Sequence, residues 1–142
     1  MSRRPFIVGN WKMNKGPQDA GSLASQLKAQ LAGTSAVDVG VSPPYISIPS
    51  VCRMLQHTGI IVAGQDLHPQ TSGAFTSAIS GEMIRQAGCS YVIVGHSERR
   101  ALFGDDDKTV NAKVHAAFRA GLLPILCVGE TRTQRESGEA DE

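Results

Sequence analysis

Five short apolar runs recur along the chain, and this repeat constrains its fold more than any other feature. The runs start 31, 23, 31 and 31 residues apart. Each is short and rich in aliphatic and β-branched residues, as expected for strands that are buried on both faces. We therefore predict strands over residues 6–8, 37–41, 60–63, 91–94 and 122–128.

Helix-period stretches lie between the apolar runs. Leu23, Leu27 and Leu31 recur at every fourth position and would form one apolar stripe on a helix. Similar stripes predict helices around residues 48–55, 82–87 and 110–118. Each predicted helix is followed by a glycine, the usual residue for the left-handed turn that ends a helix; these are Gly33, Gly59, Gly88 and Gly121.

Alternating strands and helices at this spacing predict right-handed crossovers and a parallel sheet. The pattern alone leaves a doubly wound open sheet and a barrel as alternatives. No Gly-x-Gly-x-x-Gly follows the first strand, which argues against a dinucleotide-binding fold. We expect one α/β domain over residues 1–142, with about five parallel strands and four crossover helices.

Composition excludes several classes of protein. The formal net charge of +1 gives no reason to expect binding to nucleic acid or to an anionic membrane surface. No apolar run approaches the ~20 residues that span a bilayer, and the run after the basic N-terminus is too short for a signal peptide. The three cysteines include no CxxC pair, which argues against a disulfide framework or a metal site. We expect a cytoplasmic protein.

Polar residues follow the predicted strands, at the edge where parallel α/β folds bind ligands. A lysine and a histidine among them suit a small anionic substrate with a carbonyl group to polarise. Each also has a plain structural explanation: Lys12 as a solvated charge, His96 as a satisfied structural residue, and Cys127 as core packing within a strand. The full set is Asn10, Lys12, Ser42, Gln65, Asp66, His96, Ser97, Glu98, Gly129 and Glu130.

Four segments, in order, resemble segments of the triosephosphate isomerase family. They are Gly9–Asn14 in the first loop, Ser72–Thr76 in the long third loop, Tyr91–Arg99 in the fourth-strand signature, and Leu126–Glu130 after the fifth strand. The resemblance runs from about Pro5 to Gly138 without large gaps. It implies a partial (β/α)8 TIM barrel that comprises strands one to five of eight.

The resemblance also implies roles, with a small phosphorylated triose as substrate and no metal or organic cofactor. Lys12 would hold the phosphate and the developing negative charge, and Asn10 would position Lys12. His96 would polarise the carbonyl, as a neutral histidine electrophile is known to do in this same enzyme. Glu98 would lie close to the site, with Lys113 as its ion-pair partner. The expected site residues are Asn10, Lys12 and His96, supported by Glu98, Lys113 and Cys127.

The family's glutamate base follows its sixth strand, and neither that base nor the later closing loop has a counterpart in these 142 residues. We therefore expect the chain alone to be nearly inactive as an isomerase. One alternative is a non-catalytic, self-associating half-barrel module derived from this enzyme. Another is a different phosphosugar barrel, which would require the four similar segments to be coincidental.

Self-association is expected from the open sheet. The family usually has Gly-Glu at the position of Ser77-Ala78, and its glutamate pairs across the dimer contact with the arginine matching Arg99. Ala78 cannot make this pair, so the family's usual dimer contact lacks this support. We still expect a homo-oligomer, in the first place a dimer, because the first and fifth strands are unpaired edges that can pair with another chain. The inward faces of Ile7, Val39, Val62 and Ile93 would lack covering strands.

Overall fold

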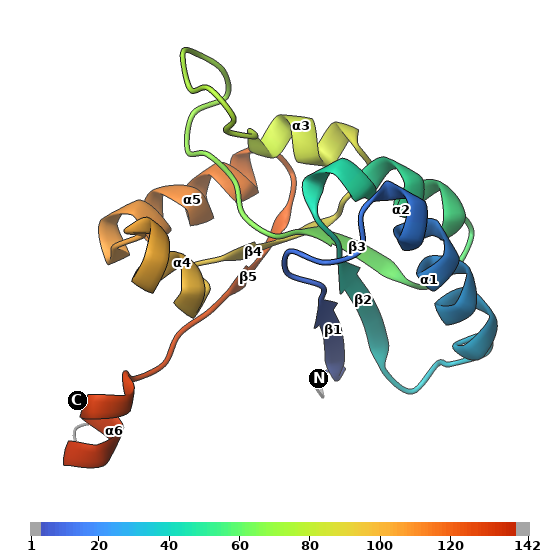
Figure 1. Ribbon diagram of the computed structural model, residues 1–142, viewed down its shortest axis with the longest axis horizontal. Helices are drawn as coiled ribbons and strands as arrows, with labels where there is room; N and C mark the ends of the chain where they lie inside the picture. Colours follow the sequence, from blue (N-terminus) through green and yellow to red (C-terminus); the bar gives the residue numbers. More distant parts are fainter. Residues whose placement is uncertain (1–3, 139–142) are drawn as a thin grey trace.

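The computed structural model describes residues 4–138 and contains one parallel five-stranded sheet (Figure 1). Its strands are neighbours in chain order, so each crossover joins adjacent strands. This confirms the predicted partial barrel. The first three and last four residues of the domain expected over 1–142 lie outside the described part. The strands are β1 (Phe6–Asn10), β2 (Asp38–Ser42), β3 (Ile61–Gly64), β4 (Tyr91–Val94) and β5 (Leu123–Leu126).

Helices cover one face of this sheet, whereas the last helix, α6, lies apart from it (Figure 1). The β4–β5 connection holds two helices, where the apolar stripe predicted one. The extra helix, α4, ends at Gly104, whose φ of 73° turns the chain toward the next helix. None of the helices in residues 4–138 is long and apolar enough to cross a bilayer. They are α1 (Pro17–Gln30), α2 (Ile48–Met54), α3 (Gly81–Gln86), α4 (Ser97–Phe103), α5 (Asp107–Arg119) and α6 (Arg132–Ser137), with a 3-10 turn, η1 (Tyr45–Ser47), before α2.

Asp106 starts α5 by accepting a hydrogen bond from the backbone N–H of Thr109 at 2.7 Å. This hydrogen bond lowers the pKa of Asp106. Asp107 adds a second negative charge in the first turn, where the helix dipole favours it. Among the predicted helix-ending glycines, three are left-handed, but at the end of α2 the left-handed residue is His57, with φ 60°, and not Gly59.

The hydrophobic core lies between the sheet and its covering helices. Valines from the middle strands contact small residues of α1 and α5 and larger ones of α2, and nearly all are fully buried. Burial of this apolar surface is the main force that holds the layers together. The core includes Ala20, Ala24, Val41, Ile48, Val51, Val62, Ile84, Val92, Val94, Val110, Ala116, Ala117 and Leu122.

The opposite, inner face of the sheet carries only part of the predicted set. Ile93 belongs to it, since it lies two residues after Tyr91 and is absent from the core beneath the helices. The Phe6 and Tyr91 rings meet across it with centroids 5.0 Å apart. Gly40 lies on the same face, since a Cβ there would be 3.2 Å from Phe6 and 3.3 Å from Val8. The prediction that Val62 faces inward is wrong, because Val62 packs in the core beneath the helices.

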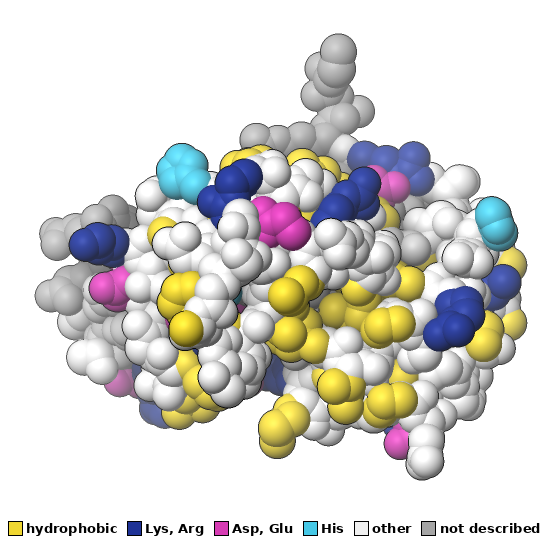
Figure 2. Space-filling model, turned by 90° about the horizontal axis from the view of Figure 1, so that it is seen from above, with side chains coloured by type: hydrophobic (Ala, Val, Ile, Leu, Met, Phe, Trp, Pro, Cys, Tyr) yellow, Lys and Arg dark blue, Asp and Glu magenta, His cyan; other side chains and the backbone are white. Residues whose placement is uncertain are grey.

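Within the described residues, β1 and β5 each pair with one neighbour only. Their side chains are accordingly exposed: Ile7 to 60%, Leu126 to 48%, and Val128 just past β5 to 82%. This confirms that the first and fifth strands are apolar edges. From above, further hydrophobic side chains gather in one area of the surface, with charged side chains scattered around it (Figure 2).

The long connection after β3 projects beyond α3 (Figure 1). Although it has no helix or strand, it is internally bonded. The backbone N–H of His68 donates to the carbonyl of Ile79 at 2.8 Å, and the rings of His68 and Phe75 lie 4.0 Å apart. These contacts give the loop a defined shape.

Candidate functional site

Four of the predicted site residues meet at one cavity of about 200 Å³. Asn10 is the last residue of β1 and Lys12 lies in the loop after it, whereas His96 and Glu98 follow β4. Gln65, which follows β3, also lines the cavity. The site therefore lies at the carboxyl ends of the strands, where the sequence placed it.

The backbone of Lys12 is held in an unusual conformation. Its φ of 52° lies in the left-handed region, which costs a non-glycine residue roughly 1–2 kcal/mol. Two hydrogen bonds fix it: the Lys12 N–H donates to Asn10 Oδ1, and Gln65 Nε2 donates to the Lys12 carbonyl, both at 2.9 Å. Gln65 also donates to the Ser42 carbonyl at 2.9 Å, which ties the loop to β2. Gln65 was among the polar residues expected at this edge of the sheet, but the family resemblance gave it no role.

The Lys12 ammonium pairs with Glu98. Lys12 Nζ lies 2.5 Å from Glu98 Oε1, and both side chains remain about half exposed. This hydrogen bond lowers the pKa of the Glu98 carboxyl. The predicted pairing of Glu98 with Lys113 is wrong, because Lys12 is nearer and Lys113 is buried elsewhere.

His96 caps the start of α4. Its Nδ1 accepts a hydrogen bond from the backbone N–H of Glu98 at 3.2 Å. A nitrogen that accepts carries no proton, so this contact leaves the ring proton on Nε2. Glu98 Oε2 lies 3.6 Å from the same Nδ1, and the two would form an ion pair only with a protonated ring.

Gly95 positions His96 and should not tolerate a side chain. Its φ is 72°, and a Cβ there would lie 3.0 Å from Val110 Cγ1. We expect Gly95→Ala to lower the free energy of unfolding by roughly 1–3 kcal/mol, measured by urea denaturation. Gly104→Ala is the matched control, since Gly104 has φ 73° but no atom within 4 Å of its Cβ position. Equal losses in both variants would show that crowding at Gly95 is unimportant.

Lys113 lies beside the cavity, in a buried cluster of charges. Its Nζ is 2.8 Å from Asp66 Oδ1 and 2.7 Å from Asp105 Oδ2, and only 4% of Lys113 is exposed. Arg99 pairs with the same two carboxylates at 2.9 and 3.2 Å. The Tyr45 hydroxyl donates to the Asp66 carbonyl. Burial raises the pKa of Asp66, more than Lys113 and Arg99 lower it.

Cys127 lies just past β5 and does not line the cavity. Its backbone N–H donates to the Val94 carbonyl at 2.9 Å, and its side chain is only half buried, because β5 is an edge. Burial raises the pKa of its thiol. The interpretation of Cys127 as a core residue therefore holds only in part.

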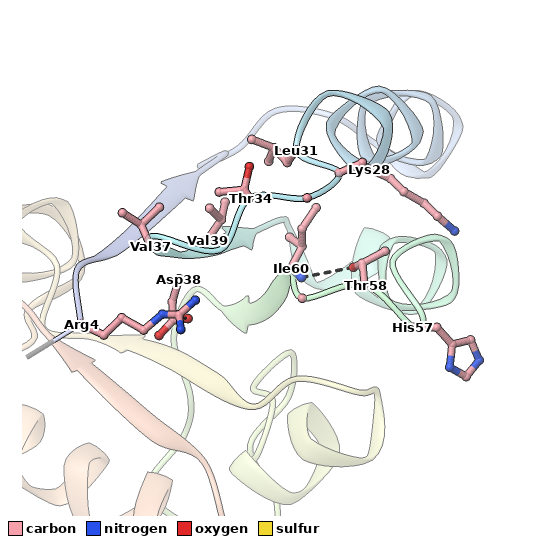
Figure 3. Close-up of a pocket in the computed structure, with 13 residues that line it drawn as sticks. Arg4, Lys28, Leu31, Thr34, Val37, Asp38, Val39, His57, Thr58 and Ile60 are labelled. Carbon is pink, nitrogen blue, oxygen red and sulfur yellow. Dashed lines mark hydrogen bonds and ion pairs between the residues drawn. The ribbon is translucent and has the colours of Figure 1, made fainter.

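A separate cavity of about 420 Å³ opens at the amino ends of β2 and β3 (Figure 3). Its charged residues do not converge on the space. Arg4 is paired with Asp38 at 2.7 Å, and the Lys28 and His57 side chains extend outward (Figure 3). The smaller cavity, where the polar groups meet, is therefore the candidate functional site.

Together the sheet, its helical cover and the polar carboxyl edge define a (β/α) half-barrel with a site at the strand ends. The family model for triosephosphate isomerase matches residues 5–142. The chain belongs to the triosephosphate isomerase family.

Comparison with individual relatives supports this assignment to the family. The chain is 48% identical to a triosephosphate isomerase of Acetivibrio thermocellus over all 142 residues, which are 56% of that protein. It is 48% identical over 139 residues to one from Roseiflexus, covering 55% of it. The crystal structure of triosephosphate isomerase from Bartonella henselae superposes with a TM-score of 0.91 at 38% identity, over 97% of this chain and 57% of that one. The chain thus spans a little over half the length of these relatives.

Proposed function

We propose that this chain provides the lysine and histidine side of a site that interconverts dihydroxyacetone phosphate and glyceraldehyde 3-phosphate. The observation that carries the proposal is the meeting of Asn10, Lys12, His96 and Glu98 at one cavity. Family membership supports it, although the chain covers only 56% of the Acetivibrio relative. The proposal therefore concerns the part of the site that lies within these residues.

Lys12 would bind the substrate phosphate. Its ammonium is half exposed and reaches the cavity, and its only carboxylate partner among the described residues is Glu98. A phosphate dianion carries more charge than one carboxylate and offers more acceptor oxygens, so it would compete well for Lys12. The Asn10 side chain would keep the Lys12 backbone in the strained conformation that aims it there.

His96 would act on the two substrate oxygens. With Nδ1 occupied by the Glu98 N–H, Nε2–H is the group available to donate. Donation to the carbonyl oxygen would stabilise the charge that develops there as the enediolate forms. Nε2 would then give its proton to that oxygen and take one from the neighbouring hydroxyl, which completes the exchange without a metal or an organic cofactor.

The carbon-bound proton needs a separate base. In the family this is a glutamate after the sixth strand, beyond the part of the relatives that this chain matches. General-base catalysis is worth roughly 10²–10⁴-fold. We therefore propose that the 142-residue chain binds the substrate but turns it over very slowly by itself.

Ligand binding tests the role of Lys12. We expect Lys12→Met to weaken binding of dihydroxyacetone phosphate to the chain by roughly 10- to 100-fold, the value of one charge-assisted contact. Isothermal titration calorimetry would measure this, and Lys108→Met, which removes an exposed lysine of α5, is the control. Unchanged affinity in Lys12→Met would remove Lys12 from the site.

A second candidate function, a self-associating module, is favoured by the open sheet edges. We propose that two copies pair through β1 and β5. Ile7 and Leu126 are 60% and 48% exposed there, and within residues 4–138 each of these strands pairs with one neighbour only. Among the described residues, Arg99 finds its carboxylates within its own chain, in Asp66 and Asp105. Arg99 is therefore neutralised without the ion pair that it would make in the family with a loop glutamate of a second subunit.

Light scattering over a range of concentrations tests this association. We expect either a defined oligomer, in the first place a dimer, or progressive aggregation. The Leu126→Lys variant should reduce the association in either case. Leu102→Lys, on α4 and 75% exposed, is the control because it adds the same charge away from the edges. A folded monomer at every concentration would show that the half-barrel protects its own edges.

A further inference from the structure

Two of the three cysteines form a pair at the end of the molecule opposite the candidate site. Cys52 lies in α2, and Cys89 lies between α3 and β4. Both are free thiols; Cys52 is half buried and Cys89 is fully buried. Cys52 packs against the hydrophobic cluster that contains Cys89, and each thiol shifts the pKa of the other. Gly88 makes this approach possible, because a Cβ there would lie 2.9 Å from Cys52 Sγ.

The two thiols are not equivalent. The neighbouring Cys89 thiol lowers the pKa of Cys52, in spite of partial burial. The Cys52 thiol and burial raise the pKa of Cys89. Arg85, which donates from Nη1 to the Cys89 carbonyl at 3.0 Å, lowers the pKa of Cys89 by less than these two raise it. These directions make Cys52 the more nucleophilic sulfur of the pair and leave the proton on Cys89.

The nucleophilic sulfur is also the accessible one. A cleft of about 310 Å³ opens beside the end of α2 and the start of β3, and Cys52 and Gly88 both line it. A small oxidant can reach Cys52 through this cleft without entering the core. Cys127 provides the contrast, since burial raises the pKa of its thiol.

We propose that Cys52 and Cys89 form an oxidisable dithiol site that reacts with hydroperoxides. The Cys52 thiolate attacks one peroxide oxygen, the O–O bond breaks, and Cys52 becomes a sulfenic acid while hydroxide leaves. The Cys89 sulfur then attacks the Cys52 sulfur, and the sulfenic oxygen leaves as water with the Cys89 proton. In total two thiols lose two electrons and hydrogen peroxide becomes two waters. The bond formed would link α2 to the start of β4.

The experiment uses the full chain with dilute hydrogen peroxide, followed by digestion without reductant and mass spectrometry. We expect a peptide pair joined through Cys52 and Cys89, reversed by dithiothreitol, with titratable thiols falling from three to one. Cys52 should react about 10-fold faster than Cys127, in line with its greater thiolate character.

Single variants separate the steps. In the Cys89→Ser variant, oxidation of Cys52 should stop at the sulfenic acid, which a cyclic diketone traps. In the Cys52→Ala variant, Cys89 should stay reduced. The Cys127→Ser variant should behave as the parent chain. Circular dichroism would confirm that each variant is folded, and Cys89→Ala replaces Cys89→Ser if that variant is not. Faster oxidation of Cys127 than of Cys52, or a sulfenic acid that persists in the parent chain, would overturn the proposal, and so would disulfides formed only between chains.

Discussion

Replacing Lys113 by methionine is expected to lower the free energy of unfolding by about 3–5 kcal/mol, because it removes one partner from a buried ion cluster. Lys113 contacts Asp66 and Asp105, and the Asp66 and Asp105 side chains are 15% and 5% exposed. Without Lys113, the single guanidinium of Arg99 would have to serve both carboxylates. Such a loss is a large part of the stability of an ordinary domain.

Urea denaturation of Lys113→Met measures this loss, and Lys108→Met is the matched control on the exposed face of the same helix. The pH dependence gives a second check. The pKa of Asp66 is already raised in the folded chain, and it should rise further without Lys113. A carboxyl with a raised folded pKa favours folding as the pH falls through that pKa, so the deficit should shrink as the pH is lowered toward the ordinary pKa of an aspartate, about 4. A loss below about 1 kcal/mol would mean that Arg99 alone neutralises the cluster.

The strands and the position of the site could be predicted from the sequence because both depend on local patterns. The apolar runs are short and evenly spaced, and polar residues such as Asn10 and His96 follow them directly. Parallel strands bring such residues to one edge whatever the details of packing. The additional helix α4 could not be predicted in this way, since none of its residues is buried and it leaves no apolar stripe.

Partners across the fold could not be predicted so well. Several carboxylates follow the strands, and the sequence does not say which lies nearest to Lys113. In the structure α5 brings Lys113 to Asp66 and Asp105, while the left-handed turn at Lys12 brings that lysine to Glu98. Such pairings depend on how helices pack and on a single backbone angle.

The wrong assignment of the inner face has a simpler cause. Side chains alternate along a strand, so residues two apart share a face. Phe6 and Val8 both contact the Gly40 position on the inner face, and Asn10 continues their series toward the site. Counting back from Asn10 would therefore have placed Phe6 and Val8 inward, and Ile7 outward.

The largest effect that we expect is an increase in the isomerase rate when a second polypeptide supplies the missing base. A polypeptide covering the part of the Acetivibrio thermocellus relative that this chain does not match should raise the isomerase rate of the chain by roughly 10²–10⁴-fold, since it would supply the base. A coupled assay of glyceraldehyde 3-phosphate, together with size-exclusion chromatography of the mixture, would measure rate and association together.

Variants of this chain decide whether its residues take part in that turnover. In the mixture, His96→Gln should return the rate to that of the chain alone while binding of dihydroxyacetone phosphate changes little, because a hydrogen bond to the carbonyl strengthens as charge develops on the oxygen. Lys108→Met should leave the rate unchanged. If the chain alone matched the full-length relative, a base within these residues would have to be found. If the His96→Gln mixture were fully active, His96 would have no part in catalysis, and its place at the start of α4 would be purely structural.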